Sequence, residues 1–263
     1  MSKMAVKVLT AVIMIAVAVP VLYLGGIWME ILMAFIAGGA AYEAARLGNE
    51  KVPVIPMVLN FIAIVMLYKA PATHFAAVAA FWAVILFTIS LIDEKFTTDS
   101  VVYNFMITLL AGMALRCLTL LYHQPAEGWK YFLFVGLACF GCDTGAYFFG
   151  VFLGKHKMIP RVSPNKTWEG SIGGYATGAI VSFVYSLFVL KDVLPVSLLA
   201  AASLLLPLVA QIGDLSFSSI KRRFGIKDFS NLFPGHGGVL DRVDSVIFCL
   251  MVFNALMIIW RLA

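Results

Sequence analysis

The stretch from Ser218 to Asp244 reads SSIKRRFGIKDFSNLFPGHGGVLDRVD and separates two long apolar runs of the chain. Basic residues cluster at its start, a Pro-Gly-His-Gly-Gly turn follows at Pro234–Gly238, and two carboxylates, Asp241 and Asp244, stand at its end. Lysine and arginine donate charge-assisted hydrogen bonds to phosphate oxygens, and carboxylates three residues apart share a helix face that can bind a hard divalent cation. Glycines let backbone N–H groups approach a phosphate closely. The pattern predicts a site for a metal-bound polyphosphate.

The remainder of the chain is strongly apolar. Of its 263 residues 62% are hydrophobic and 13% are charged, and the mean hydropathy is +0.97. So little polar surface cannot cover a water-soluble globule, which indicates an all-α polytopic integral membrane protein. The formal net charge of +5 comes from basic residues scattered between apolar runs, so no nucleic acid partner is expected. The four cysteines lie in apolar surroundings and are expected to be buried thiols.

Apolar runs long enough for a membrane helix recur along the whole chain. They predict a single membrane domain over residues 1–263, with the first run retained as a signal-anchor because it lacks a small-residue cleavage site. About nine transmembrane helices are expected, at 7–24, 27–46, 53–69, 75–92, 100–122, 130–153, 170–190, 193–213 and 244–262. Two long polar loops remain, at 154–169 and 214–243.

The lysines and arginines predict the orientation of these spans. If the N-terminus is cytoplasmic, most of the 19 basic residues fall on cytoplasmic segments, chiefly in the two long loops. We therefore expect the N-terminus inside and the C-terminus on the opposite side. Both polar loops then face the cytoplasm, where nucleotides are found.

The 218–244 stretch resembles the signature of the phosphatidate cytidylyltransferase (CDP-diacylglycerol synthase) family, and a weaker similarity covers Cys142–Gly170. The positions that match the signature are Ser218, Lys221, Arg222, Lys227, Asp228, Ser230, Pro234, His236, Gly237, Gly238, Asp241, Arg242 and Asp244. The resemblance implies transfer of CMP from CTP to phosphatidic acid, giving CDP-diacylglycerol and pyrophosphate. It also implies one or two Mg²⁺ ions, with room for an additional monovalent cation, and a homodimer in the bacterial inner membrane with its active site facing the cytoplasm.

The catalytic motifs then lie in the C-terminal part, 130–263. Catalytic roles are expected for Lys221, Arg222, Lys227, Asp228, His236, Asp241, Arg242 and Asp244. Substrate contacts are expected from Ser163, Asn165, Lys166, Thr167, Ser218, Gly237 and Gly238. Metal ligation is expected from Asp214, Asp241, Asp244 and Asp143. Asp143 is included because acids inside apolar spans usually serve a function.

Simpler interpretations stay open for several of these residues. Asp241 and Asp244 could be acids that stabilise a helix N-terminus, and Lys221–Arg223 could be a positive-inside cluster that contacts anionic lipids. Residues 163–170 could be an ordinary loop with a helix N-cap. Glu43 and Arg46, spaced i and i+3, are interpreted as an ion pair.

Two other functions also stay open. A CTP-dependent polyprenol or phytol kinase would share the membrane setting and the nucleotide, but an alcohol would attack the γ-phosphorus. An ion-coupled transporter is suggested by Asp143, Glu30 and Arg116 within spans, and the sequence assigns no role to the last two. The transporter leaves the polar 218–244 stretch without a purpose.

Overall fold

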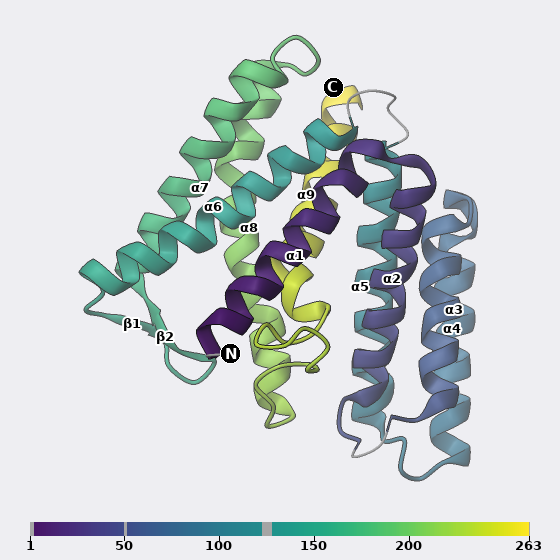
Figure 1. The fold of residues 1–263 in the computed structure, drawn as a ribbon. Helices are drawn as coiled ribbons and strands as arrows, with labels where there is room; N and C mark the ends of the chain where they lie inside the picture. The colour runs from purple at the N-terminus through teal and green to yellow at the C-terminus, as the bar shows by residue number, and fades with distance from the viewer. Residues whose placement is uncertain (1–2, 50–51, 123–127, 263) are drawn as a thin grey trace. The chain divides into compact units, whose positions relative to one another are not determined.

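The computed structural model describes residues 3–49, 52–122 and 128–262. In this part of the chain nine α-helices, one 3₁₀ turn (η1, Ala72–His74) and one two-stranded sheet form (Figure 1). The helices are α1 (Lys3–Leu24), α2 (Gly26–Arg46), α3 (Val54–Lys69), α4 (Phe75–Ile92), α5 (Thr98–Tyr122), α6 (Gly128–Leu153), α7 (Trp168–Val189), α8 (Val196–Arg223) and α9 (Leu240–Leu262). The all-α polytopic prediction is confirmed.

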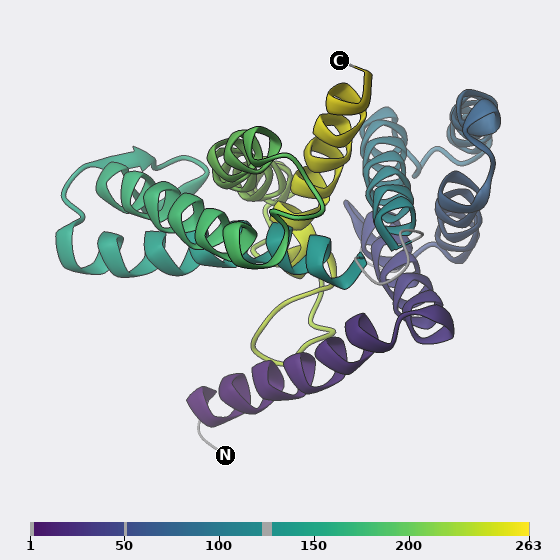
Figure 2. The same cartoon turned by 90° about the horizontal axis from the view of Figure 1, so that it is seen from above.

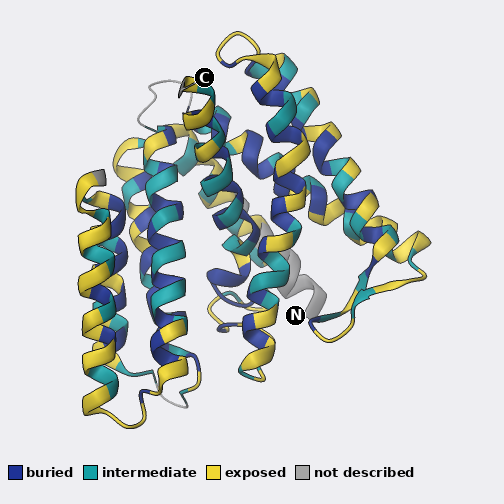
Figure 3. Ribbon diagram, turned by 180° about the vertical axis from the view of Figure 1, so that it is seen from behind, coloured by how far each residue is buried: buried dark blue, intermediate teal, exposed yellow. Residues whose placement is uncertain are grey.

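Among the described residues, seven helices are long and apolar enough to cross a membrane, namely α2 and α4 to α9. The apolar helix α3 is shorter, and α1 contributes a short apolar segment, Val12–Leu24. Exposed residues, yellow in Figure 3, run along the helices and include large apolar side chains such as Leu91 at 86% and Phe188 at 82% exposed. Such side chains are stable on a helix surface when lipid surrounds it.

The chain forms two compact units. The first comprises Met1–Thr119 with Asp228–Arg242, and the second comprises Leu120–Lys227 with Val243–Ala263. In the first unit α2, α3, α4 and α5 lie side by side (Figure 1). A buried apolar cluster that includes Trp82, Leu86 and Phe96 joins α3, α4 and α5.

Buried polar contacts also join the helices of the first unit. Asn60 Nδ2 donates to Asn104 Oδ1 at 2.6 Å, and Thr108 Oγ1 donates to Asn60 Oδ1 at 3.1 Å. These hydrogen bonds join α3 to α5. They satisfy amide and hydroxyl groups that would be costly to leave unpaired in an apolar setting.

In the second unit, α6 and α7 run side by side in both views (Figure 1 and Figure 2). They approach closely because glycines face each other: a Cβ on Gly141 would lie 3.3 Å from Gly178 Cα, and one on Gly145 would lie 3.1 Å from Gly174 Cα. A hairpin of β1 (Lys157–Ile159) and β2 (Ser163–Thr167) joins the two helices, with Lys157 opposite Thr167. This antiparallel hairpin falls inside the predicted loop 154–169.

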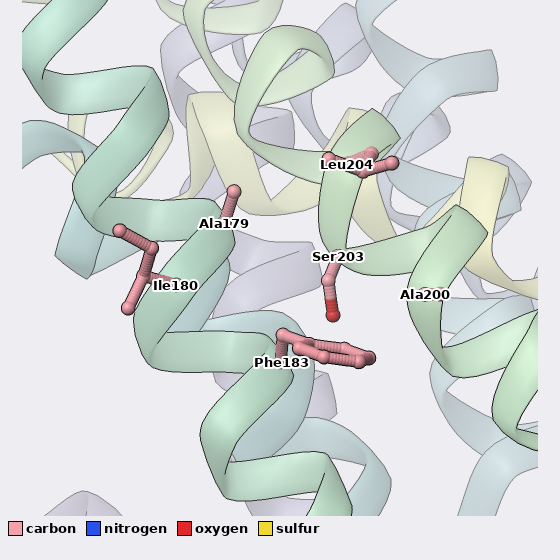
Figure 4. Close-up of a pocket in the computed structure, with 6 residues that line it drawn as sticks. All are labelled: Ala179, Ile180, Phe183, Ala200, Ser203 and Leu204. Carbon is pink, nitrogen blue, oxygen red and sulfur yellow. The ribbon is translucent and has the colours of Figure 1, made fainter.

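An apolar pocket of about 220 Å³ lies between α7 and α8. Its lining residues are Ala179, Ile180, Phe183, Ala200, Ser203 and Leu204 (Figure 4). The pocket contains none of the predicted site residues.

Helix α8 corrects the predicted boundary of the loop 214–243, because it continues to Arg223. Hydropathy suggested an end near Gly213, yet basic residues in a last helical turn are favoured by the helix dipole. Gly225, two residues after the end of the helix, has a φ of +66°; Gly225 N donates to Arg222 O and Ile226 N donates to Lys221 O. This is the hydrogen-bond pattern of a glycine C-cap. Ser218 and Lys221 therefore project from a helix.

Candidate active site

A charged cluster in the second unit contains several of the predicted residues. Lys166 on β2 forms an ion pair with Asp214 on α8. Ser218, one turn later on α8, donates from Oγ to Asp214 Oδ1 at 3.4 Å. The ion pair is partly buried, so its charges are less screened than those of a pair in open water. Strand β2 and helix α8 thus supply opposite charges to one place.

Helices α9 and α6 add further carboxylates to this cluster. Asp244 on α9 interacts electrostatically with Asp214, Lys221 and Asp143, the last from α6. Its Oδ1 accepts the N–H of Ser245 at 2.8 Å. Lys221 is only 7% exposed. The structure therefore brings Asp143, Asp214 and Asp244 into one electrostatic neighbourhood with two lysines.

The close approach of α8 and α9 depends on Gly213. A Cβ at this position would lie 2.9 Å from Asp244 O and 3.2 Å from Ser245 Cα. Any larger residue would force the helices apart, because backbone atoms cannot yield as a flexible side chain can. Gly213 thus lets this part of α8 lie against Asp244 and Ser245 of α9.

The donor chemistry of this cluster suits a hard divalent cation, since Mg²⁺ prefers carboxylate oxygens and keeps several waters. Within residues 3–49, 52–122 and 128–262, no three His, Cys, Asp or Glu side chains are already grouped as a set of metal ligands. Lys166 provides the positive charge next to Asp214 instead. The residues fit Mg²⁺ by their chemistry, and the ligand set stays a prediction.

Other predicted residues of the second unit make structural contacts. Arg222 donates from Nε to Val162 O at 3.0 Å and from Nη1 to Ile226 O at 2.8 Å. Thr167 Oγ1 accepts the N–H of Gly170 at 3.1 Å and caps α7. Ser163 and Asn165 lie on β2, where Asn165 is exposed. Lys227 is exposed and is the last residue of the segment Leu120–Lys227 of the second unit.

The segment Asp228–Arg242, here called the HGG segment, belongs to the first unit. Its turn is closed by hydrogen bonds from Phe233 N to Gly237 O and from His236 N to Phe233 O, at 2.8 and 2.9 Å. Among the described residues His236 Nδ1 is one of the few buried side-chain atoms without a hydrogen-bond partner. Asp228 and Arg242 are exposed.

Asp241 faces into the HGG segment. Its Oδ2 accepts the N–H of Gly238 at 2.9 Å and that of Phe229 at 2.8 Å, and the residue is only 8% exposed. This oxygen therefore binds backbone N–H groups next to the start of α9, which agrees with the interpretation of Asp241 as an acid at a helix N-terminus. Metal binding by Asp241 remains a prediction.

Sequence reasoning missed the part played by Glu43. Its carboxylate accepts hydrogen bonds from Ser230 Oγ, Val239 N and Leu240 N in the HGG segment, and does not form the expected ion pair with Arg46. The i, i+3 spacing suggested a local partner, whereas the actual partners lie more than 180 positions away.

Gln211 was missed as well. Its side chain contacts Cys142 Sγ at 3.3 Å and Ser171 O at 2.9 Å, which links α8 to α6 and α7. The signal was a glutamine inside an apolar run, a residue that usually forms hydrogen bonds across membrane helices.

Charges outside the polar loops also have partners. Glu30 pairs with Lys69, and Arg116 donates to Ala70 O, all within the first unit. These contacts give Glu30 and Arg116 structural roles that the sequence did not reveal.

Comparisons with known proteins show which family the chain is similar to. The profile of the cytidylyltransferase family matches residues 5–260. A phosphatidate cytidylyltransferase of Staphylococcus saprophyticus is 35% identical over 262 residues, which is 97% of this chain and 99% of the relative. Proteins of the same name from Staphylococcus aureus (strain COL) and Staphylococcus haemolyticus are 34% and 32% identical, each with 97% of this chain and 99% of the relative covered.

The family match and the relatives both extend over nearly the whole chain, including both compact units. They confirm the resemblance predicted from the 218–244 stretch. The chain belongs to the cytidylyltransferase family.

Proposed function

We propose that this protein is a phosphatidate cytidylyltransferase that transfers CMP from CTP to phosphatidic acid. An oxygen of the lipid phosphate forms a bond to the α-phosphorus of CTP. The bond from that phosphorus to the oxygen bridging to the β-phosphate breaks, and pyrophosphate leaves with the electron pair. The products are CDP-diacylglycerol and pyrophosphate.

The nucleophile needs no general base in this reaction. A phosphate monoester has a second pKa of about 6 and is largely ionised at neutral pH. The protein must instead bring two anionic substrates together and compensate their charge. The charged cluster of the second unit suits this task.

The observation that carries the proposal is the meeting of Lys166, Asp214, Lys221 and Asp244 from a hairpin and two helices. Lys166 and Lys221 bind phosphate oxygens and keep the triphosphate in line with the attacking lipid phosphate. Arg222, Lys227, His236 and Arg242 are proposed to support the substrates' phosphates through further donors.

Asp214, Asp244 and Asp143 are proposed to hold Mg²⁺, and Asp241 is proposed as a further ligand because it stands three residues before Asp244 in the sequence. When bound, the ion neutralises charge that develops on the triphosphate. The carboxylates would hold the ion, and with it the triphosphate, in a fixed position. Ser218 keeps Asp214 in place through its hydrogen bond.

The membrane arrangement proposed from the sequence accompanies this function. It has nine spans, a cytoplasmic N-terminus, an active site open to the cytoplasm of a bacterial cell and a homodimeric assembly. Seven apolar helices of sufficient length in the described part of the chain support its general form. The orientation follows from the basic residues of the hairpin and of the end of α8.

The test is the fate of the label from CTP labelled in its β- and γ-phosphates. Purified protein in detergent, with phosphatidic acid and Mg²⁺, is expected to release labelled pyrophosphate and to leave the lipid unlabelled. Labelled lipid phosphate formed from an alcohol would instead establish a kinase. Ion flux in liposomes without CTP turnover would establish a transporter. The transporter hypothesis rested partly on Glu30 and Arg116, and both residues have structural partners.

A further inference from the structure

Glu43 is the less exposed of the two carboxylates, Glu43 and Asp241, that accept hydrogen bonds from the HGG segment. It stands in the last turn of α2, and its relative exposure is 0%. A carboxylate removed from water is costly unless hydrogen bonds compensate its charge. The identity of its partners therefore indicates what the residue is for.

All three partners are donors from the HGG segment. Glu43 Oε1 accepts from Ser230 Oγ at 2.6 Å and from Val239 N at 2.7 Å, and Oε2 accepts from Leu240 N at 2.7 Å. The N–H groups of Val239 and Leu240 lie at the start of α9, where a helix has no internal acceptors for them. A carboxylate on another helix thus caps α9 and also attracts the positive end of its dipole.

Glycines make this contact possible. A Cβ on Gly238 would meet Glu43 Oε1 and lie 2.7 Å from Ser230 Oγ. On α2, a Cβ on Gly39, one turn before Glu43, would lie 2.8 Å from Val239 Cβ. Helix α2 and the HGG segment are therefore fitted to each other on both sides of the carboxylate.

Two buried carboxylates share the work of holding the segment. Asp241 binds the N–H groups of Phe229 and Gly238 from within the segment, whereas Glu43 binds it from α2. The His236–Gly238 turn lies between the residues that these two acids fix. Its conformation depends on both.

We infer that Glu43 is a positioning residue for the cytidylyl transfer: it fixes the HGG segment and the first turn of α9 in the conformation that catalysis requires, without contacting a substrate. This inference rests on the proposed function for the role of the segment. A carboxylate is required because the segment offers three donors, whereas a glutamine would direct its own NH₂ group at one of them.

The first measurement is hydrogen exchange in the Glu43→Gln protein, followed in peptides that contain Val239 and Leu240. Their exchange is expected to be at least about tenfold faster than in wild type, since a hydrogen bond to a charged acceptor is lost. The matched control is Glu30→Gln, the same change on the same helix, where the partner is Lys69. The control is expected to leave exchange in these peptides unchanged.

The second measurement is steady-state kinetics with CTP, phosphatidic acid and Mg²⁺. Glu43→Gln is expected to lower kcat by about tenfold to a hundredfold, with KM for CTP within about threefold of wild type, because misplaced groups slow the chemical step. Glu43→Asp, which keeps the carboxylate, is expected to restore part of kcat. Ser230→Ala is expected to cost less alone, and less than additively when combined with Glu43→Gln.

The outcomes separate the two proposals. Unchanged exchange at Val239 and Leu240 overturns the inference, and so does faster exchange with an unchanged kcat. A lower melting temperature with no change in kcat per folded molecule shows that Glu43 only stabilises the fold, and this result also overturns the inference. Absence of pyrophosphate release by wild type refutes the proposed function, and the exchange experiment then still decides whether Glu43 holds the segment.

Discussion

The carboxylates of the two compact units are used differently. In the first unit Glu43 and Asp241 are almost wholly buried and accept hydrogen bonds from backbone N–H groups. In the second unit Asp214 and Asp244 are only partly buried and lie among lysines and other carboxylates. Oxygens of the first pair hold backbone N–H groups in place, whereas the second pair lies among other charged side chains.

The difference matters for function because the two kinds of contact respond differently to a ligand. Backbone donors around Glu43 have no other acceptor once they are buried, so their bonds are costly to break. Lys166 can leave Asp214 when another cation takes its place there or when a phosphate replaces Asp214 as its partner, since a long flexible side chain moves easily. The 214–244 stretch thus contains carboxylates that support the chain and carboxylates that we propose to bind the metal ion.

The strongest test of this contrast is Asp214→Asn. Losing the charge is expected to reduce kcat by about a thousandfold, equivalent to about 4 kcal/mol, with little change in melting temperature. Pyrophosphate release and thermal unfolding in detergent measure the two effects. The matched control is Asp192→Asn, an exposed aspartate between α7 and α8, which is expected to keep full activity. Near-normal activity of Asp214→Asn would place the reacting carboxylates elsewhere.

Lys166→Ala is expected to have the next largest effect. Removal of a charged donor to phosphate is expected to lower kcat/KM for CTP by about a hundredfold. Lys157→Ala removes the same type of side chain from an exposed position of the opposite strand, where Lys157 pairs with Thr167, and is expected to change activity by less than about twofold. Equal losses in both variants would mean that the hairpin contributes general positive charge and not a specific contact.

Much of the fold was predictable because hydropathy reports burial in lipid directly. The expected spans 27–46 and 75–92 lie within a residue of α2 and α4. The end of α8 was missed because its last turns, with Lys221 and Arg222, resemble a loop by hydropathy. Helix-terminus electrostatics and Gly225 stop that helix instead.

The site was predictable to the extent that it lies within a local motif. Asp214 and Lys166 were named as site residues, but their ion pair joins positions 48 apart and needed the structure. Glu43 was missed for the same reason, because no local periodicity indicates a partner almost two hundred residues away. Local spacing even suggested the wrong partner, Arg46.

A smaller effect is expected when two neighbouring glycines of α2 are each replaced by alanine in separate variants. Gly39→Ala would bring a Cβ to 2.8 Å from Val239 Cβ, and the overpacking is expected to cost about 1–3 kcal/mol of stability. Gly38→Ala is the matched control, since nothing lies within 4 Å of its Cβ, and alanine there is expected to stabilise α2 by up to about 1 kcal/mol. Thermal unfolding in detergent measures both variants. Equal shifts would show that α2 and the HGG segment do not pack as described.

The smallest effect is expected where a charge pair is exposed. Glu30 and Lys69 have side chains 36% and 48% exposed, so solvent screens their attraction and Glu30→Gln is expected to change stability by less than about 1 kcal/mol. CTP turnover is expected to remain at the wild-type level, since the pair lies outside the charged cluster and the HGG segment. A large loss of turnover in Glu30→Gln would contradict this difference between the carboxylates of the two units, because an exposed acid of the first unit would then act in the reaction. We therefore measure turnover, melting temperature and their salt dependence in this variant. Unchanged turnover would show that a carboxylate takes part in the reaction because of its position in the fold, and not merely because it is an acid.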